Sequence, residues 1–332
     1  MPDDRHAPAD RRYRVAQWAT GNIGLRALRA VIEHPRFDLV GLWVNSEAKA
    51  GRDAGQLCGV GDTGVIATRD VEEILSLGAD CVLYMPQGCD VDVLCRLLGS
   101  GTNVVTTRGE FHRPASMDPV VRARIAEACR AGSTSIHSTG SSPGFISEAL
   151  PLVLTSLERR LDCLTIEESA DLSSRNSPEL LFRLMGFGAD LAAFDPRRLA
   201  QHGVASFGAS LRLLADALSL PLDDVEGTTE VAACRQRTTI AAGSIDAGRM
   251  AAQRFEVTGV RDGRPLLRFR ATWYCAKDLE PAWDLRDTGW HVLVEGDTPL
   301  DVAISFPVSP DRYAAVSPGF TAHRAVNAVP FV

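Results

Sequence analysis

The segment Tyr13–Ala27 constrains the fold more than any other part of this chain. An apolar strand leads directly into a glycine turn that opens an amphipathic helix, a geometry that binds a pyrophosphate. Gly21 allows the backbone to approach the phosphates, Gly24 allows the helix to lie close to the strand, and the N–H groups of the turn point at the anion. Ala19 replaces the first glycine of the usual Gly-x-Gly-x-x-Gly, so a generic strand-turn-helix remains the alternative. The residues expected to contact a dinucleotide here are Thr20, Gly21, Asn22, Ile23 and Gly24.

Strands and helices alternate through the residues that follow. Apolar runs predict strands at 37–44, 81–85, 103–106 and 133–137, and helical periodicity predicts helices at 71–77, 91–98 and 119–131. Such alternation is typical of a parallel sheet covered by helices. We therefore predict an α/β Rossmann-like dinucleotide-binding domain over residues 1–150, with ligands at the carboxyl ends of its strands.

The pattern changes to longer strands from Asp162 onward. Strands are expected at 162–172, 224–241, 249–260, 265–276, 288–296 and 299–307, with a helical stretch over 178–219. Asp262 and Gly263 between two apolar runs predict a tight hairpin turn. We predict an α+β substrate and dimerisation domain over 151–315. Its largely antiparallel open sheet either covers the nicotinamide end of the cofactor or pairs with the sheet of a second subunit. The last segment, 316–332, is expected to form a helix from Ser317 that packs back on the first domain.

Composition excludes several classes of function. The 332 residues carry a net charge of -7, and the arginines are scattered along the sequence. This pattern does not favour binding to nucleic acid or to an anionic membrane surface. The polar start Met1–Arg5 lacks the apolar core of a signal peptide, and no run of about 18 apolar residues exists, so a cytoplasmic protein is expected. The eight cysteines form no Cys-x-x-Cys pair and are predicted to be reduced core residues that bind no metal.

The second predicted strand ends without the acidic residue that NAD-specific enzymes place near the ribose 2′-hydroxyl. Asn45 and Ser46 can donate hydrogen bonds there, and Lys49 or Arg52 can pair with a 2′-phosphate. Glu47 lies close by, and its negative charge weakens this preference for a 2′-phosphate. The alternative interpretation is that all of these are solvated loop residues. The cofactor expected is NADP(H), with NAD(H) as the alternative.

The carboxyl ends of two later strands carry the main candidate for chemistry. These strands end in Tyr84–Gly88 and Thr106–Glu110, where the nicotinamide ribose and ring are expected. Glu110 is placed to touch substrate, where a carboxylate can stabilise a cationic imine or ammonium and move a proton during hydride transfer. The alternative is a surface ion pair of Glu110 with Arg108 or Arg113. The further cofactor contacts expected in these segments are Pro86, Gln87, Thr107 and Gly109.

A turn rich in serine and glycine, Ser138–Phe145, follows the last strand of the first domain. Its exposed amides and its one aromatic side chain can form the floor of a ligand site. Ser142, with Pro143 at the first helical position, also predicts a helix N-cap. The residues expected to contact substrate, chosen by position, are Phe145, Ser142, Glu168 and Arg175.

Several of these segments together resemble one family. They read VAQWATGNIG at 15–24, GRDAG at 51–55, TRGE at 107–110, GSSPGF at 140–145 and TAHRAVN at 321–327. The combination resembles the 2,4-diaminopentanoate dehydrogenase and native amine dehydrogenase family, whose N-terminal domain is similar to that of dihydrodipicolinate reductase. Ser142 stands where the family often has Asn, and relatives are expected to continue beyond Val332 by a short tail.

The resemblance implies a function. It implies NAD(P)-dependent oxidative deamination of an amine or, in reverse, reductive amination of an aldehyde or ketone with ammonia, in a homodimer. The family's key glutamate maps onto Glu110. We therefore expect an NAD(P)H-dependent oxidoreductase acting on the CH–NH2 group of a small amine, with hydride transfer assisted by Glu110.

Other functions stay open. Dihydrodipicolinate reductase needs a His-His-x-x-Lys element, whereas the histidines here are isolated and the only lysines are Lys49 and Lys277. A carbonyl or imine reductase differs from the amine dehydrogenase only in whether ammonia is needed. A non-catalytic dinucleotide-binding regulator would bind NADPH tightly in an occluded pocket without turnover.

Overall fold

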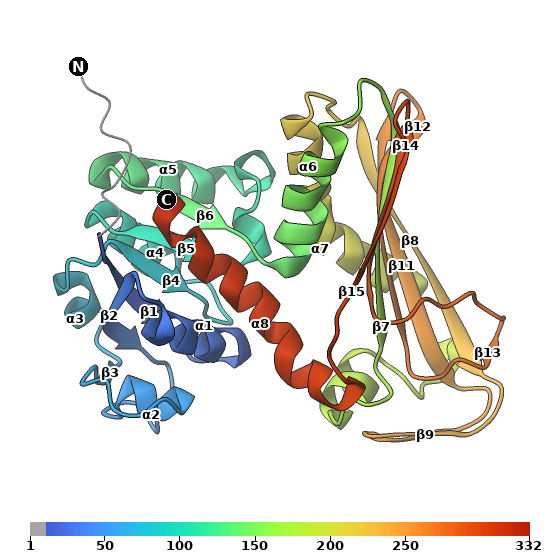
Figure 1. Cartoon of the computed structure of the whole chain (residues 1–332), viewed down its shortest axis with the longest axis horizontal. Helices are drawn as coiled ribbons and strands as arrows, with labels where there is room; N and C mark the ends of the chain where they lie inside the picture. Colours follow the sequence, from blue (N-terminus) through green and yellow to red (C-terminus); the bar gives the residue numbers. More distant parts are fainter. Residues whose placement is uncertain (1–10) are drawn as a thin grey trace. The chain divides into compact units, whose positions relative to one another are not determined.

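Two large β-sheets organise residues 11–332, the part of the chain that the computed structural model describes (Figure 1). We call residues 11–141 with 317–332 unit 1, and residues 142–316 unit 2. The polar start Met1–Arg5 and the other residues of the predicted 1–150 domain that precede residue 11 lie outside the described residues.

Unit 1 contains a six-stranded parallel sheet with the order β3-β2-β1-β4-β5-β6. The strands are β1 (Tyr13–Trp18), β2 (Phe37–Trp43), β3 (Ala67–Thr68), β4 (Cys81–Tyr84), β5 (Asn103–Thr106) and β6 (Ile136–Ser138). Val15, Leu83 and Val105 of the central strands have no exposed surface, as expected of a parallel sheet covered on both faces. The predicted Rossmann-like parallel sheet is confirmed, and its strand order reverses between β1 and β4, where such sheets bind ligands.

The helices of unit 1 begin in two different ways. The helices before β6 are α1 (Asn22–Glu33), α2 (Ala54–Cys58), α3 (Val71–Ser76), α4 (Val91–Gly99) and α5 (Pro119–Gly132). Asp53, Asp70, Asp90 and Asp118 accept hydrogen bonds from first-turn N–H groups of α2, α3, α4 and α5. α1 instead begins after Gly21, with no side-chain cap. Its first N–H groups therefore lack the carboxylate partner that α2 to α5 have.

The last helix, α8 (Pro310–Ala328), begins in unit 2 and ends in unit 1. Apolar residues between 322 and 329 pack into the unit 1 core beside Val15. The helix begins earlier than the predicted start at Ser317 and continues through Pro318. Serine followed by proline is a common helix start, which explains why the sequence pattern misplaces it.

Unit 2 is built on a seven-stranded mixed sheet with the order β13-β8-β11-β12-β7-β14-β15. The strands are β7 (Leu161–Asp171), β8 (Asp224–Cys234), β11 (Met250–Arg261), β12 (Arg264–Tyr274), β13 (Leu279–Glu280), β14 (Gly289–Gly296) and β15 (Leu300–Ser305). Only β7 and β12 pair in parallel, so the predicted, largely antiparallel sheet is confirmed. Between β11 and β12, Asp262 and Gly263 have φ of +51° and +71°, as the predicted tight turn requires.

The strand predicted over 224–241 is wrong in its second part. β8 ends at Cys234, and the polar residues 235–237 leave the sheet. β9 (Thr238–Ile240) then pairs with β10 (Gly243–Ile245) in a separate two-stranded sheet. The apolar pattern does not reveal the end of β8, because Ile240 of β9 is also buried although it lies outside the seven-stranded sheet.

The helical stretch predicted over 178–219 is interrupted. It divides into η4 (Glu179–Leu184), η5 (Leu191–Ala193) and α7 (Pro196–Ala217). Gly186 and Gly188 have φ of +78° and +79°, which ends the first segment. Figure 1 shows α7 and α6 (Leu150–Thr155) on the same face of the sheet, and Phe207 of α7 packs against Phe255 with ring centroids 5.8 Å apart.

Within residues 11–332, no helix is both long and apolar enough to cross a lipid bilayer. The same residues contain no group of three or more His, Cys, Asp or Glu side chains arranged to hold a metal ion. All eight cysteines of the chain lie among them as free thiols. Burial raises the pKa of the Cys81 thiol to about 12, so it packs as a neutral side chain.

Candidate active site

The turn between β1 and α1 is held in shape by side chains behind it. Gln17, which has no exposed surface, donates from Nε2 to the carbonyl oxygen of Ala19 at 2.9 Å. Ala19 has φ of +73°, the left-handed conformation that glycine adopts most easily at this first position of the fingerprint. Lys49 Nζ donates to O and Oγ1 of Thr20 at 2.9 and 3.0 Å. These three hydrogen bonds fix the backbone of the turn.

The two glycines of the turn have different surroundings. A Cβ atom at Gly24 would lie 2.3 Å from the carbonyl oxygen of Ala19, so only glycine lets α1 approach β1 this closely. A Cβ atom at Gly21 would meet no atom within 4 Å. Gly21 thus faces open space at the uncapped N-terminus of α1, where N–H groups and the helix dipole suit an anion.

A cavity of about 650 Å³ in unit 1 connects this turn to the ends of β4 and β5. Glu110 lines it together with the predicted cofactor residues Gly21, Asn22, Ile23, Gly24, Pro86, Gln87 and Thr107. A second cavity of about 510 Å³ is lined by the predicted residues Thr20, Asn45 and Ser46 and by Lys49. Gly109 lines neither of these two cavities and begins the short helix η1 (Gly109–Phe111).

Glu110 lines the larger cavity while paired with Arg108. Arg108 Nε donates to Glu110 Oε1 at 2.6 Å, and Arg108 Nη1 donates to the carbonyl oxygens of Pro86 and Gln87 at 3.0 and 2.7 Å. Arg108 thus ties the segment after β4 to the segment after β5. The ion pair considered as an alternative is present, yet the Glu110 side chain keeps 45% of its surface exposed, so a ligand can reach it.

The predicted substrate residue Glu168 lies on β7 of unit 2. Trp273 Nε1 donates to Glu168 Oε1 at 3.4 Å, and Trp290 Nε1 donates to Oε2 at 3.3 Å. Burial raises the pKa of the Glu168 carboxyl, and donors on Ser142, Trp273 and Trp290 offset only part of that rise. The Ser142 hydroxyl lies close to the carboxyl, although its oxygen makes no hydrogen bond of regular geometry.

The other predicted substrate residues belong to the same region of unit 2. Phe145 packs against Trp290 with ring centroids 6.0 Å apart. Burial and the charge of Glu168 raise the pKa of Tyr313 to about 12, whereas Arg175 lowers it, so both charged side chains act on this phenol. The sequence pattern does not single out Trp290 and Tyr313, because aromatic residues in strands and helices are ordinary core residues.

The N-cap predicted at Ser142 is wrong. Residues 142–144 have non-helical backbone angles, with ψ of 160° at Pro143 and φ of +126° at Gly144. The N–H of Gly144 donates to Ser147 Oγ at 2.9 Å, so a serine further along the chain accepts this bond. A proline with this extended ψ cannot occupy the first helical position, so residues 142–144 do not start a helix.

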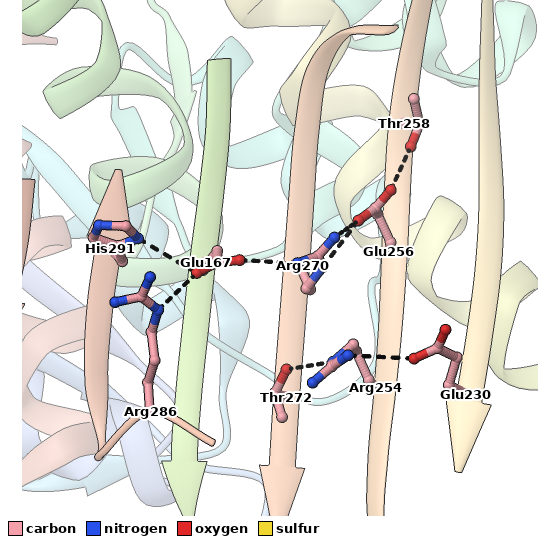
Figure 2. Close-up of polar contacts among 9 residues, drawn as sticks. All are labelled: Glu167, Glu230, Arg254, Glu256, Thr258, Arg270, Thr272, Arg286 and His291. Atoms are coloured by element: carbon pink, nitrogen blue, oxygen red, sulfur yellow. Dashed lines mark hydrogen bonds and ion pairs between the residues drawn. The ribbon is translucent and has the colours of Figure 1, made fainter. Parts of the chain in front are cut away.

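The opposite face of the unit 2 sheet carries charges of alternating sign. Figure 2 shows Glu167 between Arg270 and His291, with Arg270 also bound to Glu256. Arg270 lies 3.0 Å from Glu167 and 2.6 Å from Glu256, and Arg286 lies 3.1 Å from Glu167. A second row links Glu230, Arg254 and Thr272. We call these eight side chains the charged face.

Known proteins match this chain over most of its length. The sequence model of the 2,4-diaminopentanoate dehydrogenase C-terminal domain matches residues 145–332. An amine dehydrogenase of Streptomyces virginiae is 29% identical over 326 residues, which cover 94% of this chain and 90% of that protein. The solved amine dehydrogenase from Mycobacterium smegmatis has a similar fold, with a TM-score of 0.72, 17% identity and coverage of 98% of this chain and 92% of that chain. GenD2 from gentamicin A biosynthesis, solved in complex with NAD, matches with a TM-score of 0.52 and 14% identity over 98% of this chain and 88% of its own.

Proposed function

Because this chain belongs to the 2,4-diaminopentanoate dehydrogenase family, we propose that it is an NAD(P)-dependent oxidoreductase acting on the CH–NH2 group of a small amine. One observation carries the proposal: the glycine turn at Gly21 and the carboxylate of Glu110 line the same cavity of about 650 Å³. A dinucleotide held at the turn and a proton-transfer group beside it are the two parts that amine oxidation needs.

The residues of unit 1 fit a dinucleotide. The uncapped N–H groups of α1 and the open space at Gly21 suit a pyrophosphate. Asn45, Ser46 and Lys49 are the groups available to a ribose 2′-phosphate, since they line the adjoining cavity. Among the described residues that line this cavity, none is acidic. We therefore expect NADP(H) to bind more tightly than NAD(H).

Glu110 is the proposed proton-transfer group. In the proposed reaction, one primary amine, one oxidised NAD(P) and one water are converted to one carbonyl compound, one ammonia, one NAD(P)H and one proton. The oxidised cofactor would accept the hydride. Glu110 accepts a proton from the substrate ammonium, which leaves the neutral amine, and releases that proton to solvent. The carboxylate is then negative again, and its charge favours the iminium that forms when the amine loses hydride. Arg108 positions this carboxylate through its own bonds to Pro86 and Gln87.

Cofactor turnover by the purified full-length chain tests this function. Oxidation of NADPH and of NADH is followed with small aldehydes, ketones and amino-ketones, with and without high ammonium. The expected result is turnover that requires ammonium, and amine-dependent reduction of NADP+ in the reverse direction. Turnover without ammonium would make the protein a carbonyl reductase, and cofactor binding without turnover would favour a dinucleotide-binding regulator.

We also propose that the charged face packs against the same face of a second copy in a homodimer. Glu256, Arg270, Glu167 and Arg286 alternate in sign, and such a row is complementary to itself after a two-fold rotation. Small polar side chains fill the positions beside the charges, and Thr272 on this face is only 6% exposed. Short side chains of this kind let two sheet faces approach closely.

A further inference from the structure

One tryptophan of unit 1 lines the cavity that adjoins the glycine turn. Trp43 is the last residue of β2, and it borders the cavity of about 510 Å³ that is also lined by Asn45, Ser46 and Lys49. Its side chain is half-buried, so part of the indole packs inside unit 1 and part remains accessible. The sequence pattern does not single out this residue, because an aromatic residue in an apolar strand is usually a core residue.

Trp43 is the outer member of a row of aromatic rings. One face of its indole lies against Trp18, with ring centroids 4.4 Å apart and ring planes 11° from parallel. Trp18 is only 3% exposed and contacts Tyr84 in turn, with centroids 5.8 Å apart. Because Trp18 covers one face of Trp43, a ligand that stacks on Trp43 must use the opposite face.

The N–H edge of the same indole is already occupied. Trp43 Nε1 donates to the carbonyl oxygen of Arg69 at 3.1 Å. This hydrogen bond and the stack on Trp18 together fix the plane of the ring, so little side-chain freedom is lost when a ligand packs against it. Trp43 therefore presents a ligand with a rigid, flat, apolar surface.

The rest of the Trp43 cavity suits an uncharged ring. Residues 85–88 line it from the segment after β4, which lies on the other side of β1 from β2. A Cβ atom at Gly88 would meet no atom within 4 Å, so the backbone there borders open space. Among the described residues that line the cavity, Lys49 is the only charged one. A flat heterocycle without charge can therefore enter beside Trp43 without losing an ion pair.

The two cavities of unit 1 meet at the glycine turn. Gly21 and residues 85–87 line both the Trp43 cavity and the larger cavity that contains Glu110. A dinucleotide whose pyrophosphate lies at Gly21 therefore has one nucleoside in each cavity. The nicotinamide belongs beside Glu110, where the proposed hydride transfer occurs, so the adenosine belongs beside Trp43. The 2′-phosphate is a substituent of that adenosine, which agrees with the position of Lys49 in the same cavity.

We propose that Trp43 forms an adenine-binding subsite, in which the purine stacks on the indole face that Trp18 leaves free. The subsite rests on the proposed use of a dinucleotide, and it assigns each half of that cofactor to one cavity. Every nucleobase has an aromatic face, and stacking on a side chain of this kind is a large part of its binding energy. Trp43 takes no part in hydride or proton transfer.

Titration of the full-length, cofactor-free chain with 2′,5′-ADP, the adenosine half of NADP, tests the subsite. The wild type is expected to bind it saturably, with quenching of tryptophan emission. Trp43→Leu is expected to raise the Kd about 5- to 100-fold and to remove the quenching, whereas Trp43→Phe retains an aromatic face and should stay within about threefold of the wild type. Trp283→Leu replaces another half-buried tryptophan, in unit 2, and should change neither quantity.

A comparison on the wild type needs no variant. Nicotinamide cytosine dinucleotide differs from NAD only in carrying a pyrimidine, which has a smaller stacking face, in place of adenine. The wild type is expected to bind NAD+ at least about threefold more tightly than this analogue. An equal Kd for the two dinucleotides would contradict the subsite.

The outcomes also separate the subsite from the proposed function. If 2′,5′-ADP binds Trp43→Leu as tightly as the wild type, the subsite is wrong, while the dinucleotide and amine oxidation by Glu110 remain. If the wild type binds NADPH but not 2′,5′-ADP, the subsite alone is again excluded. Conversely, quenching by 2′,5′-ADP that is lost in Trp43→Leu and kept in Trp283→Leu supports the subsite even if no amine is oxidised.

Discussion

At the level of single residues, the proposed chemistry depends on Glu110. Glu110→Gln keeps the size of the side chain but cannot accept a proton, so kcat for amine oxidation is expected to fall about 10²- to 10⁴-fold. Steady-state kinetics with saturating NADP+ and the best amine measure this change. Glu73→Gln, on the exposed side of α3, is the matched control and should keep the wild-type rate. A full rate in Glu110→Gln would exclude the proposed proton transfer.

The carboxyl of Glu168 predicts how stability varies with pH. Burial raises its pKa in the folded chain above the unfolded value, so the folded state holds the proton more tightly. Its contribution to stability is fully present below the unfolded pKa and is lost as pH rises through the folded pKa. The Tm of the wild type relative to Glu168→Gln should therefore fall as pH rises from about 4. Thermal unfolding of both proteins over a pH series measures this, and a relative Tm that increases with pH would contradict it.

The candidate site was only partly predictable at this level. Glu110 and the glycine turn follow from sequence because each comes directly after an apolar strand, and parallel strands bring their carboxyl ends together. The partners of Glu168 do not follow, since Trp273 and Trp290 reach it only through the register of β12 and β14 on β7. Lys49 was predicted to be available to a 2′-phosphate, but its ammonium also binds Thr20.

At the level of elements, the junction of β1 and α1 gives a paired prediction. In Gly24→Ala, the new Cβ would lie 2.3 Å from a backbone oxygen, so the free energy of unfolding should fall by about 1–3 kcal/mol. In Gly21→Ala, nothing lies within 4 Å of the new Cβ, and the loss of stability should stay below about 1 kcal/mol. The methyl group of Gly21→Ala occupies the space where the pyrophosphate is proposed to bind. The Kd of this variant for NADPH should therefore rise about tenfold or more. Thermal unfolding and a fluorescence titration with NADPH measure the two effects, and equal behaviour of the two variants would count against the proposed cofactor site.

Elements were predicted well where a single physical signal defines them. The strands at the centre of unit 1 are buried on both faces and are therefore continuous apolar runs. β8 was predicted too long because Ile240 continues the apolar pattern after the chain has left the sheet. α2 and β3 were not predicted, because an element of a few residues has too short a pattern to show a period.

At the level of the whole molecule, the charged face predicts a salt-sensitive homodimer. Arg286→Glu reverses one charge of the alternating row, so the dissociation constant of the dimer should rise about tenfold or more. Light scattering on a size-exclusion column over a range of protein concentrations measures it. Arg130→Glu, on the exposed surface of α5, is the control and should leave the dimer unchanged. A wild-type chain that remains monomeric at every concentration would exclude this interface.

The path of α8 has a consequence for the order of synthesis. Unit 1 takes its strands from residues 13–138, but part of its core comes from residues 322–329, which the ribosome adds only after all of unit 2. The Rossmann sheet must therefore wait, with an apolar surface around Val15 incompletely covered, while unit 2 emerges and forms its own core. During this interval the nascent sheet exposes apolar surface of the kind that chaperones bind, and unit 1 is completed last even though it is begun first.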